Sequence, residues 1–288
     1  MKATTNGLHI WLINVVPALF PFFILTRIVI ALNQTSIPVL DKFTTKCFRT
    51  NNAGLVYFLS LLSGYPVGAK LISSYYENGL IDKAGAKKMF CFCSTSGPMF
   101  IIGAVGIGVF GSAKAGYVLL IGHILGSFLN GLLYRGKRAQ VVDYRPKISK
   151  TSINEIMFDS INSILLVGGY IVLASITIQM LQITNVIPTI TKLISKVLPL
   201  NQHLVSSVIC GIIEITNGLV MLGVADVSIT LKIVIASFII AFSGICIMMQ
   251  SVSFLDKIGL KSKEMILPKI TQAIFSLVST YLLVILIY

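Results

Sequence analysis

Charged and polar side chains inside apolar stretches are the residues of this sequence that could do chemistry. Glu214 is the sharpest case, because it is the only carboxylate deep within its apolar run and lies between Gly211 and Gly218. An ionised side chain at the centre of a bilayer costs about 2.5 to 3.5 kcal/mol on insertion scales unless it is paired or faces water. The Glu214 region is therefore either part of a binding site or a structural kink with a buried, partnered carboxylate.

A second group of such residues lies in the first half of the chain. Residues 63–70 (SGYPVGAK) contain a proline, two glycines and a lysine, and Pro66 removes a backbone donor, so we expect a broken helix there. Residues 94–98 (STSGP) are a second break, which either lines a polar cavity or is a hydrogen-bonded kink. The candidate substrate-binding residues are Gly64, Pro66, Gly68, Lys70, Ser94, Thr95, Ser96, Glu214, Asn217 and Gly218.

Two expectations follow for this candidate site. The segments 64–68 and 211–218 should approach each other near the membrane centre, since discontinuous helices at matching positions of two halves mark substrate sites. Lys70 is the candidate partner of Glu214. The alternative is that Lys70 extends to the interface, while Glu214 is protonated or bonded to Thr216, Asn217 or the serines of the second break.

The motifs of common enzymes and metal sites are absent from the sequence. It has no phosphate-binding loop of the Walker type, no pair of histidines four residues apart and no paired carboxylates. The five cysteines show no CxxC pair, and His123 has no second histidine or carboxylate nearby in sequence. We therefore expect no catalytic residues, no metal and no cofactor.

The elements that must position these residues are membrane helices. Of the 288 residues, 55% are apolar and 11% are charged, against about 25% charged in soluble domains. Long apolar runs without alternation exclude a β-barrel and predict an all-α, polytopic membrane bundle of about six to eight spans. The runs are 8–32, 53–76, 89–111, 115–134, 157–183, 203–224, 229–255 and 266–288.

Basic residues indicate how the helices are oriented. The net charge of +13 is interpreted as the accumulation of Lys and Arg on the cytoplasmic side, not as a nucleic-acid surface. The linker 135–152 holds six basic residues and one acid, so we expect it to be cytoplasmic. Residues 37–49 and 187–200 are apolar at helical spacing but interrupted by lysines, which predicts interfacial helices or arms of re-entrant hairpins.

An internal repeat divides the chain. The pattern Ile-Pro-x-Leu-x-Lys that begins at Ile37 recurs from Ile187 with Ile in place of Leu, and Ser96-Gly97 matches Ser243-Gly244. We assign residues 1–134 to repeat 1, 135–152 to the basic linker and 153–288 to repeat 2. Eight full spans would make the repeats parallel. One re-entrant hairpin per half would leave three spans each and invert them, and we favour this version slightly.

Four motifs resemble the family of the sporulation integral membrane protein YlbJ of endospore-forming bacteria. They are residues 14–24 (NVVPALFPFFI), 63–71 (SGYPVGAKL) and 94–105 (STSGPMFIIGAV), and the Gly, Glu and Gly of 211–218. The resemblance implies the "Gate" domain group, which includes nucleoside transporters and the membrane part of the ferrous-iron transporter. In that group two repeats of helices and hairpins form a permeation path.

The resemblance also implies a role in sporulation, in making the spore cortex, and a multi-pass location in the cytoplasmic membrane of a spore-forming bacterium. Our leading hypothesis is transport of a small polar solute through the junction of the repeats. The alternative is a non-transporting membrane scaffold for spore envelope assembly. The expected partners are the lipid bilayer and an unidentified solute, with a homo-oligomer left open and no nucleic acid.

Overall fold

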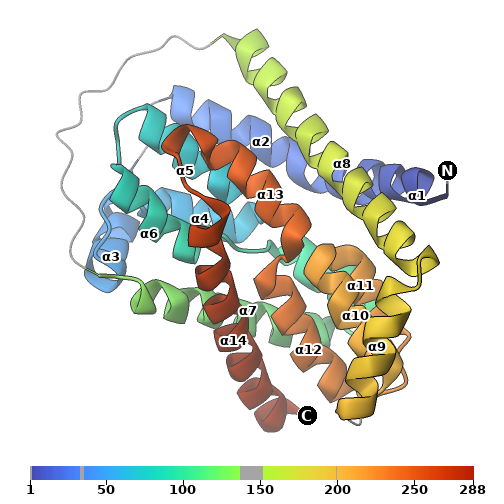
Figure 1. Cartoon of the computed structure of the whole chain (residues 1–288). Helices are drawn as coiled ribbons and strands as arrows, with labels where there is room; N and C mark the ends of the chain where they lie inside the picture. Colours follow the sequence, from blue (N-terminus) through green and yellow to red (C-terminus); the bar gives the residue numbers. More distant parts are fainter. Residues whose placement is uncertain (1, 33–35, 137–151, 199) are drawn as a thin grey trace.

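The computed structural model describes residues 2–32, 36–136, 152–198 and 200–288, and every element assigned within them is a helix (Figure 1). The predicted all-α class is confirmed. The first half contains α1 (Lys2–His9), η1 (Ile10–Val15), α2 (Val16–Ala31), α3 (Pro38–Phe48), α4 (Gly54–Ser63), α5 (Val67–Glu77), α6 (Lys83–Cys93), η2 (Met99–Val109) and α7 (Ala113–Leu133). The second half contains α8 (Ile153–Ile183), α9 (Val186–Val197), α10 (Gln202–Ile213), α11 (Ile215–Gly223), α12 (Ile229–Phe242), α13 (Gly244–Leu255), η3 (Asp256–Ile258) and α14 (Ser262–Ile287).

Several helices are long and apolar enough to cross a membrane. Within the described residues there are four, namely α7, α8, the segment Ile229–Ile258 and α14, or five if the pair 7–13 and 16–31, bent by 54°, counts as one span. This is fewer than the six to eight spans expected from sequence. Three of the expected spans are each divided into two helices of 9 to 12 residues, and a helix of 10 residues is only about 15 Å long.

The divisions fall at the breaks that the sequence predicts. Helix α4 ends at Ser63 and α5 begins at Val67, while residues 94–98 separate α6 from η2. Helix α10 ends immediately before Glu214 and α11 begins immediately after it. A fourth break, at Ser243, separates α12 from α13.

The two halves pack against each other along two helix pairs. Helices α7 and α14 lie side by side, with Gly122 against Thr280 and Gly126 against Ser276, because small residues let two helix backbones approach closely. Helix α8 packs on α1 and α2, where the indole N–H of Trp11 donates to the carbonyl of Ile164 at 3.0 Å. The short helices therefore lie in a bundle that both halves build together (Figure 1).

The two short basic segments form helices α3 and α9, as predicted. Each helix exposes apolar side chains, such as Val39 (76% exposed) on α3 and Val197 (73% exposed) on α9. The C-terminal end of α3 lies beside the start of the linker, where Arg49 Nη1 donates to the carbonyl of Gly136 at 3.2 Å. Residues 137–151 of the linker lie outside the described residues.

Candidate functional site

The break between α4 and α5 is packed directly against the break between α6 and η2. Gly64 has φ +81°, and a Cβ atom on it would lie 2.5 Å from the backbone nitrogen of Gly97. The position thus requires glycine twice, for its left-handed conformation and for the close approach. The Tyr65–Pro66 peptide bond is cis. Gly68 also allows a close approach, because a Cβ there would lie 2.7 Å from Ser60 Oγ.

Side chains of the second break complete this contact. Thr95 Oγ1 donates to the carbonyl of Ser60 at 2.9 Å, and the backbone N–H of Ser96 donates to Nε2 of His123 at 2.9 Å. Sequence reasoning brought Gly64, Pro66, Gly68 and residues 94–96 into one candidate site, and the structure places all of them together. His123, which looks isolated in sequence, contacts the same place from α7.

A buried lysine that sequence reasoning missed lies at this contact. Lys269 of α14 is 1% exposed, and its ammonium donates to the carbonyl of Ser94 (2.9 Å), Oε1 of Gln272 (3.0 Å) and the hydroxyl of Tyr65 (3.2 Å). It also lies 4.6 Å from the centre of the Tyr65 ring. Among the described residues no carboxylate pairs with it. Buried lysines usually have an acidic partner, so Lys269 is unusual in being held only by neutral groups within the described part of the chain.

A signal for Lys269 was available in the sequence. The residue follows Pro268 within the last apolar run, and a charge inside such a run is the criterion that selected Glu214. Lys269 lies near the beginning of this run, which suggests a side chain at the membrane interface. Only the packing of α14 against α6 and α7 places it at the contact between the two breaks.

His123 contributes a further buried polar atom. Its Nε2 accepts from Ser96, whereas Nδ1 is buried and has no hydrogen-bond partner within the described residues. The imidazole ring meets the Tyr65 ring edge to face, with 6.5 Å between the ring centres. Three polar side chains thus lie around the first two breaks. Tyr65 and Lys269 supply hydrogen-bond donors, and His123 supplies a ring nitrogen without a partner among the described residues.

Glu214 is satisfied within its own half of the chain. The residue is 4% exposed, and its carboxylate accepts from the backbone N–H of Thr216 (3.0 Å), the backbone N–H of Asn217 (2.8 Å) and Nδ2 of Asn217 (2.9 Å). A carboxylate suits this place because the first N–H groups of a helix have no partner within the helix and carry partial positive charge. Gly218, on the same helix, lets α11 pack against the backbone of Gly211 in α10.

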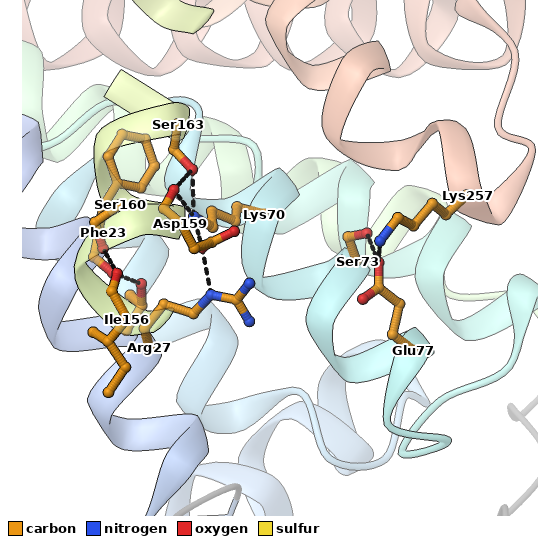
Figure 2. A network of polar contacts seen from close by, with 11 residues as sticks. Phe23, Arg27, Lys70, Ser73, Glu77, Ile156, Asp159, Ser160, Ser163 and Lys257 are labelled. Atoms are coloured by element: carbon orange, nitrogen blue, oxygen red, sulfur yellow. Dashed lines mark hydrogen bonds and ion pairs between the residues drawn. The ribbon is translucent and has the colours of Figure 1, made fainter. Parts of the chain in front are cut away.

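The expected pair between Glu214 and Lys70 is wrong. Lys70 Nζ donates to the carboxylate of Asp159 and to the hydroxyl of Ser163, both on α8, and Arg27 of α2 donates to the same carboxylate oxygen (Figure 2). Lys70 lies one turn after the break, where α5 already runs alongside α2. One half of the alternative weighed from sequence is observed, since Thr216 and Asn217 hold Glu214. The other half is wrong, because Lys70 does not extend to the interface and is only 6% exposed.

The α12–α13 break connects the two candidate segments. The hydroxyl of Tyr65 donates to the carbonyls of Ile240 (3.2 Å) and Ala241 (3.4 Å) at the end of α12. On the other side, a Cβ atom on Gly244, which has φ +70°, would lie 3.0 Å from the carbonyl oxygen of Gly211. Segments 64–68 and 211–218 therefore both contact the same break.

Comparison with known proteins identifies a relative that matches along nearly the whole chain. The sporulation integral membrane protein YlbJ of Bacillus subtilis (strain 168) is 29% identical over an alignment of 314 positions, which covers 98% of this chain and 77% of the relative. No family model matches the chain. No solved structure matches it either.

Proposed function

This chain belongs to the family of the sporulation integral membrane protein YlbJ, and we propose that it moves a small polar solute across the cytoplasmic membrane of a spore-forming bacterium. It is an integral membrane protein of a family named for sporulation. The proposal extends this to transport in support of cortex formation, through a path of the Gate-domain type at the junction of two repeats. The observation that carries it is the buried side chain of Lys269, held between two helix breaks with no carboxylate partner among the described residues.

The order of the elements supports an inverted repeat. Each half has, in sequence, a long helix or bent helix pair, a short basic helix, two short helices packed on each other, a helix broken once and a final long helix. The short helices form hairpins whose open ends are tied together. Asn52 Nδ2 donates to the carbonyl of Leu80 beside α4 and α5 (3.1 Å), and Asn201 Nδ2 donates to the carbonyl of Asp226 beside α10 and α11 (3.3 Å).

The two hairpins open at opposite ends of α7. That helix has 21 residues, which corresponds to about 30 Å, the thickness of a hydrocarbon core. Its C-terminal end leads into the linker, next to α3, which packs on α4. Its N-terminal end follows η2, where Val109 contacts Gly223 at the end of α11. Two hairpins entering from opposite faces, with three spans per half, are the arrangement that an inverted repeat requires.

The centre of this arrangement suits a solute with negative charge or hydrogen-bond acceptors. Helices α5, η2, α11 and α13 all begin at the breaks, and helix N-termini carry partial positive charge. Glu214 neutralises one of them, at α11, whereas Lys269 adds a hydrogen-bond donor without a carboxylate partner at the first pair of breaks, and this amine can take up a proton beside an anionic solute.

The variant Lys269→Met tests the proposal against a scaffold function. Methionine keeps the length of the side chain and suits a buried site, but it removes the charge. We expect transport-dependent sporulation, measured as the yield of heat-resistant spores, to fall about tenfold or more, as expected for loss of a charge-assisted contact. Lys263→Met is the matched control, because Lys263 is exposed on the same helix. A scaffold should tolerate both variants if membrane levels, measured by immunoblot, are normal.

The solute itself can be identified by comparing the metabolites of spores and mother cells with and without the gene. If the protein is a transporter, we expect one class of compound to change in the strain that lacks the gene. That compound should be depleted in its spores and retained in its mother cells. The same compound should be retained in the Lys269→Met strain and not in the Lys263→Met strain. Unchanged metabolite profiles together with defective spores would favour the scaffold.

A further inference from the structure

An open pocket of about 820 Å³ lies against α3, away from the helix breaks. It is lined by Pro38, Asp41, Lys42, Thr45, Lys46, Arg49 and Asn51. We refer to these residues as the α3 pocket. None of them belongs to the proposed solute path, so the pocket calls for a separate explanation.

The pocket carries net positive charge. Lys42, Lys46 and Arg49 are exposed; the two lysines lie four residues apart on one face of α3, and Arg49 directly follows the last residue of the helix. Within the described part of the chain, none of the three takes part in an ion pair. The one carboxylate of the pocket, Asp41, accepts from the backbone N–H of Gly54 (2.8 Å) and the hydroxyl of Ser36 (2.5 Å). It offsets one of the three positive charges, so the pocket residues keep a net positive charge.

The arginine at the end of α3 also points to an anionic, oxygen-bearing ligand. Arg49 ends α3 in the left-handed conformation with φ 53°, a position that glycine usually occupies. An arginine there brings a planar, two-pronged donor group to the pocket, and this geometry matches a phosphate.

The position of α3 indicates the source of the phosphate. Val39, 76% exposed and apolar, stands next to the pocket-lining residues Pro38 and Lys42. A helix with an exposed apolar side chain beside a basic face lies in the plane of the membrane interface, at the depth of the headgroups. We propose that the α3 pocket binds the phosphate of an anionic phospholipid headgroup on the side of the membrane that contains the basic linker.

Native mass spectrometry of the full-length protein in detergent tests this proposal with phosphatidylglycerol as the probe. The double variant Lys46→Gln, Arg49→Gln should weaken apparent phosphatidylglycerol binding about 25-fold, since each basic residue near an anionic headgroup contributes about fivefold. The matched control is Lys192→Gln, Lys196→Gln on α9, which has the same lysine spacing but Pro199 at the position of Arg49. This control should change binding less than about twofold. The charge-conserving variant Arg49→Lys should weaken binding less than the double variant does but still measurably, because it keeps the charge and loses the two-pronged geometry.

Three outcomes would overturn the proposal. Equal retention of phosphatidylcholine would show that the anionic charge is not recognised. Displacement of phosphatidylglycerol by millimolar inorganic phosphate would assign the pocket to a free anion. An equal loss of binding in the α9 control would show that binding depends on the total number of basic residues and not on the α3 pocket. Melting temperatures of all variants, measured in the same detergent, separate a lost site from a lost fold.

Discussion

Asp159 is the residue where three parts of the chain are tied together, because Arg27 of α2 and Lys70 of α5 both donate to its carboxylate on α8 (Figure 2). Lys70 is 6% exposed, and removing one member of a buried ion pair strands the other charge. We expect a double-mutant cycle on Lys70→Met and Asp159→Asn, measured as unfolding free energy in mixed micelles, to give a coupling of about 1 to 3 kcal/mol. The exposed pair Lys257–Glu77 in the same figure is the control, and its cycle should stay below about 0.5 kcal/mol. Asp159 itself is half-buried, with 33% of its side chain exposed. Equal couplings in the two cycles would show that the burial of Lys70 does not strengthen the pair.

Helix breaks are the elements that define the candidate site. The close contact between two of them can be tested by comparing alanine substitutions at two glycines with positive φ, of which one touches another segment and one does not. Gly64 and Gly79 both have positive φ, +81° and +70°, but only Gly64 touches another segment, since nothing lies within 4 Å of a Cβ on Gly79. We expect Gly79→Ala to lower the unfolding free energy by about 1 kcal/mol, the cost of the left-handed conformation. Gly64→Ala should cost about 2 to 4 kcal/mol, because overpacking against Gly97 is added and because its φ of +81° with ψ −171° lies in a region that essentially only glycine adopts. Similar losses at the two positions would mean that the breaks are not in close contact.

For the whole molecule, the orientation of the two halves has a direct test. In the inverted arrangement the loop at Asp226 lies outside and the linker lies inside, whereas eight full spans would place both inside. We expect a membrane-impermeant maleimide added to intact cells to label Asp226→Cys and to spare Ser149→Cys, in a background with Cys47→Ser. Labelling of both after the cells are opened controls for reactivity. Protection of Asp226→Cys in intact cells would support parallel repeats.

The sequence alone was sufficient to predict the local features. Proline and glycine act on their own backbone, so the interruptions at 64–68, at 94–98 and around Glu214 could be located without a structure. The lysines at 42 and 46, and at 192 and 196, likewise marked two short helices, which the structure shows as α3 and α9. Composition was enough to predict an all-helical membrane protein, because only helices satisfy their own backbone in lipid when apolar runs lack alternation.

Only the tertiary structure decided which side chains meet. Lys70 was assigned to Glu214 by the repeat alignment, yet it lies against Asp159, 89 positions away, because α5 runs beside α2 and α8 after the break. Lys269 reaches Ser94 and Tyr65 across 175 and 204 positions. Such partners depend on how helices pack, and packing depends on small residues such as Gly122 and Gly126, whose contacts no local pattern specifies.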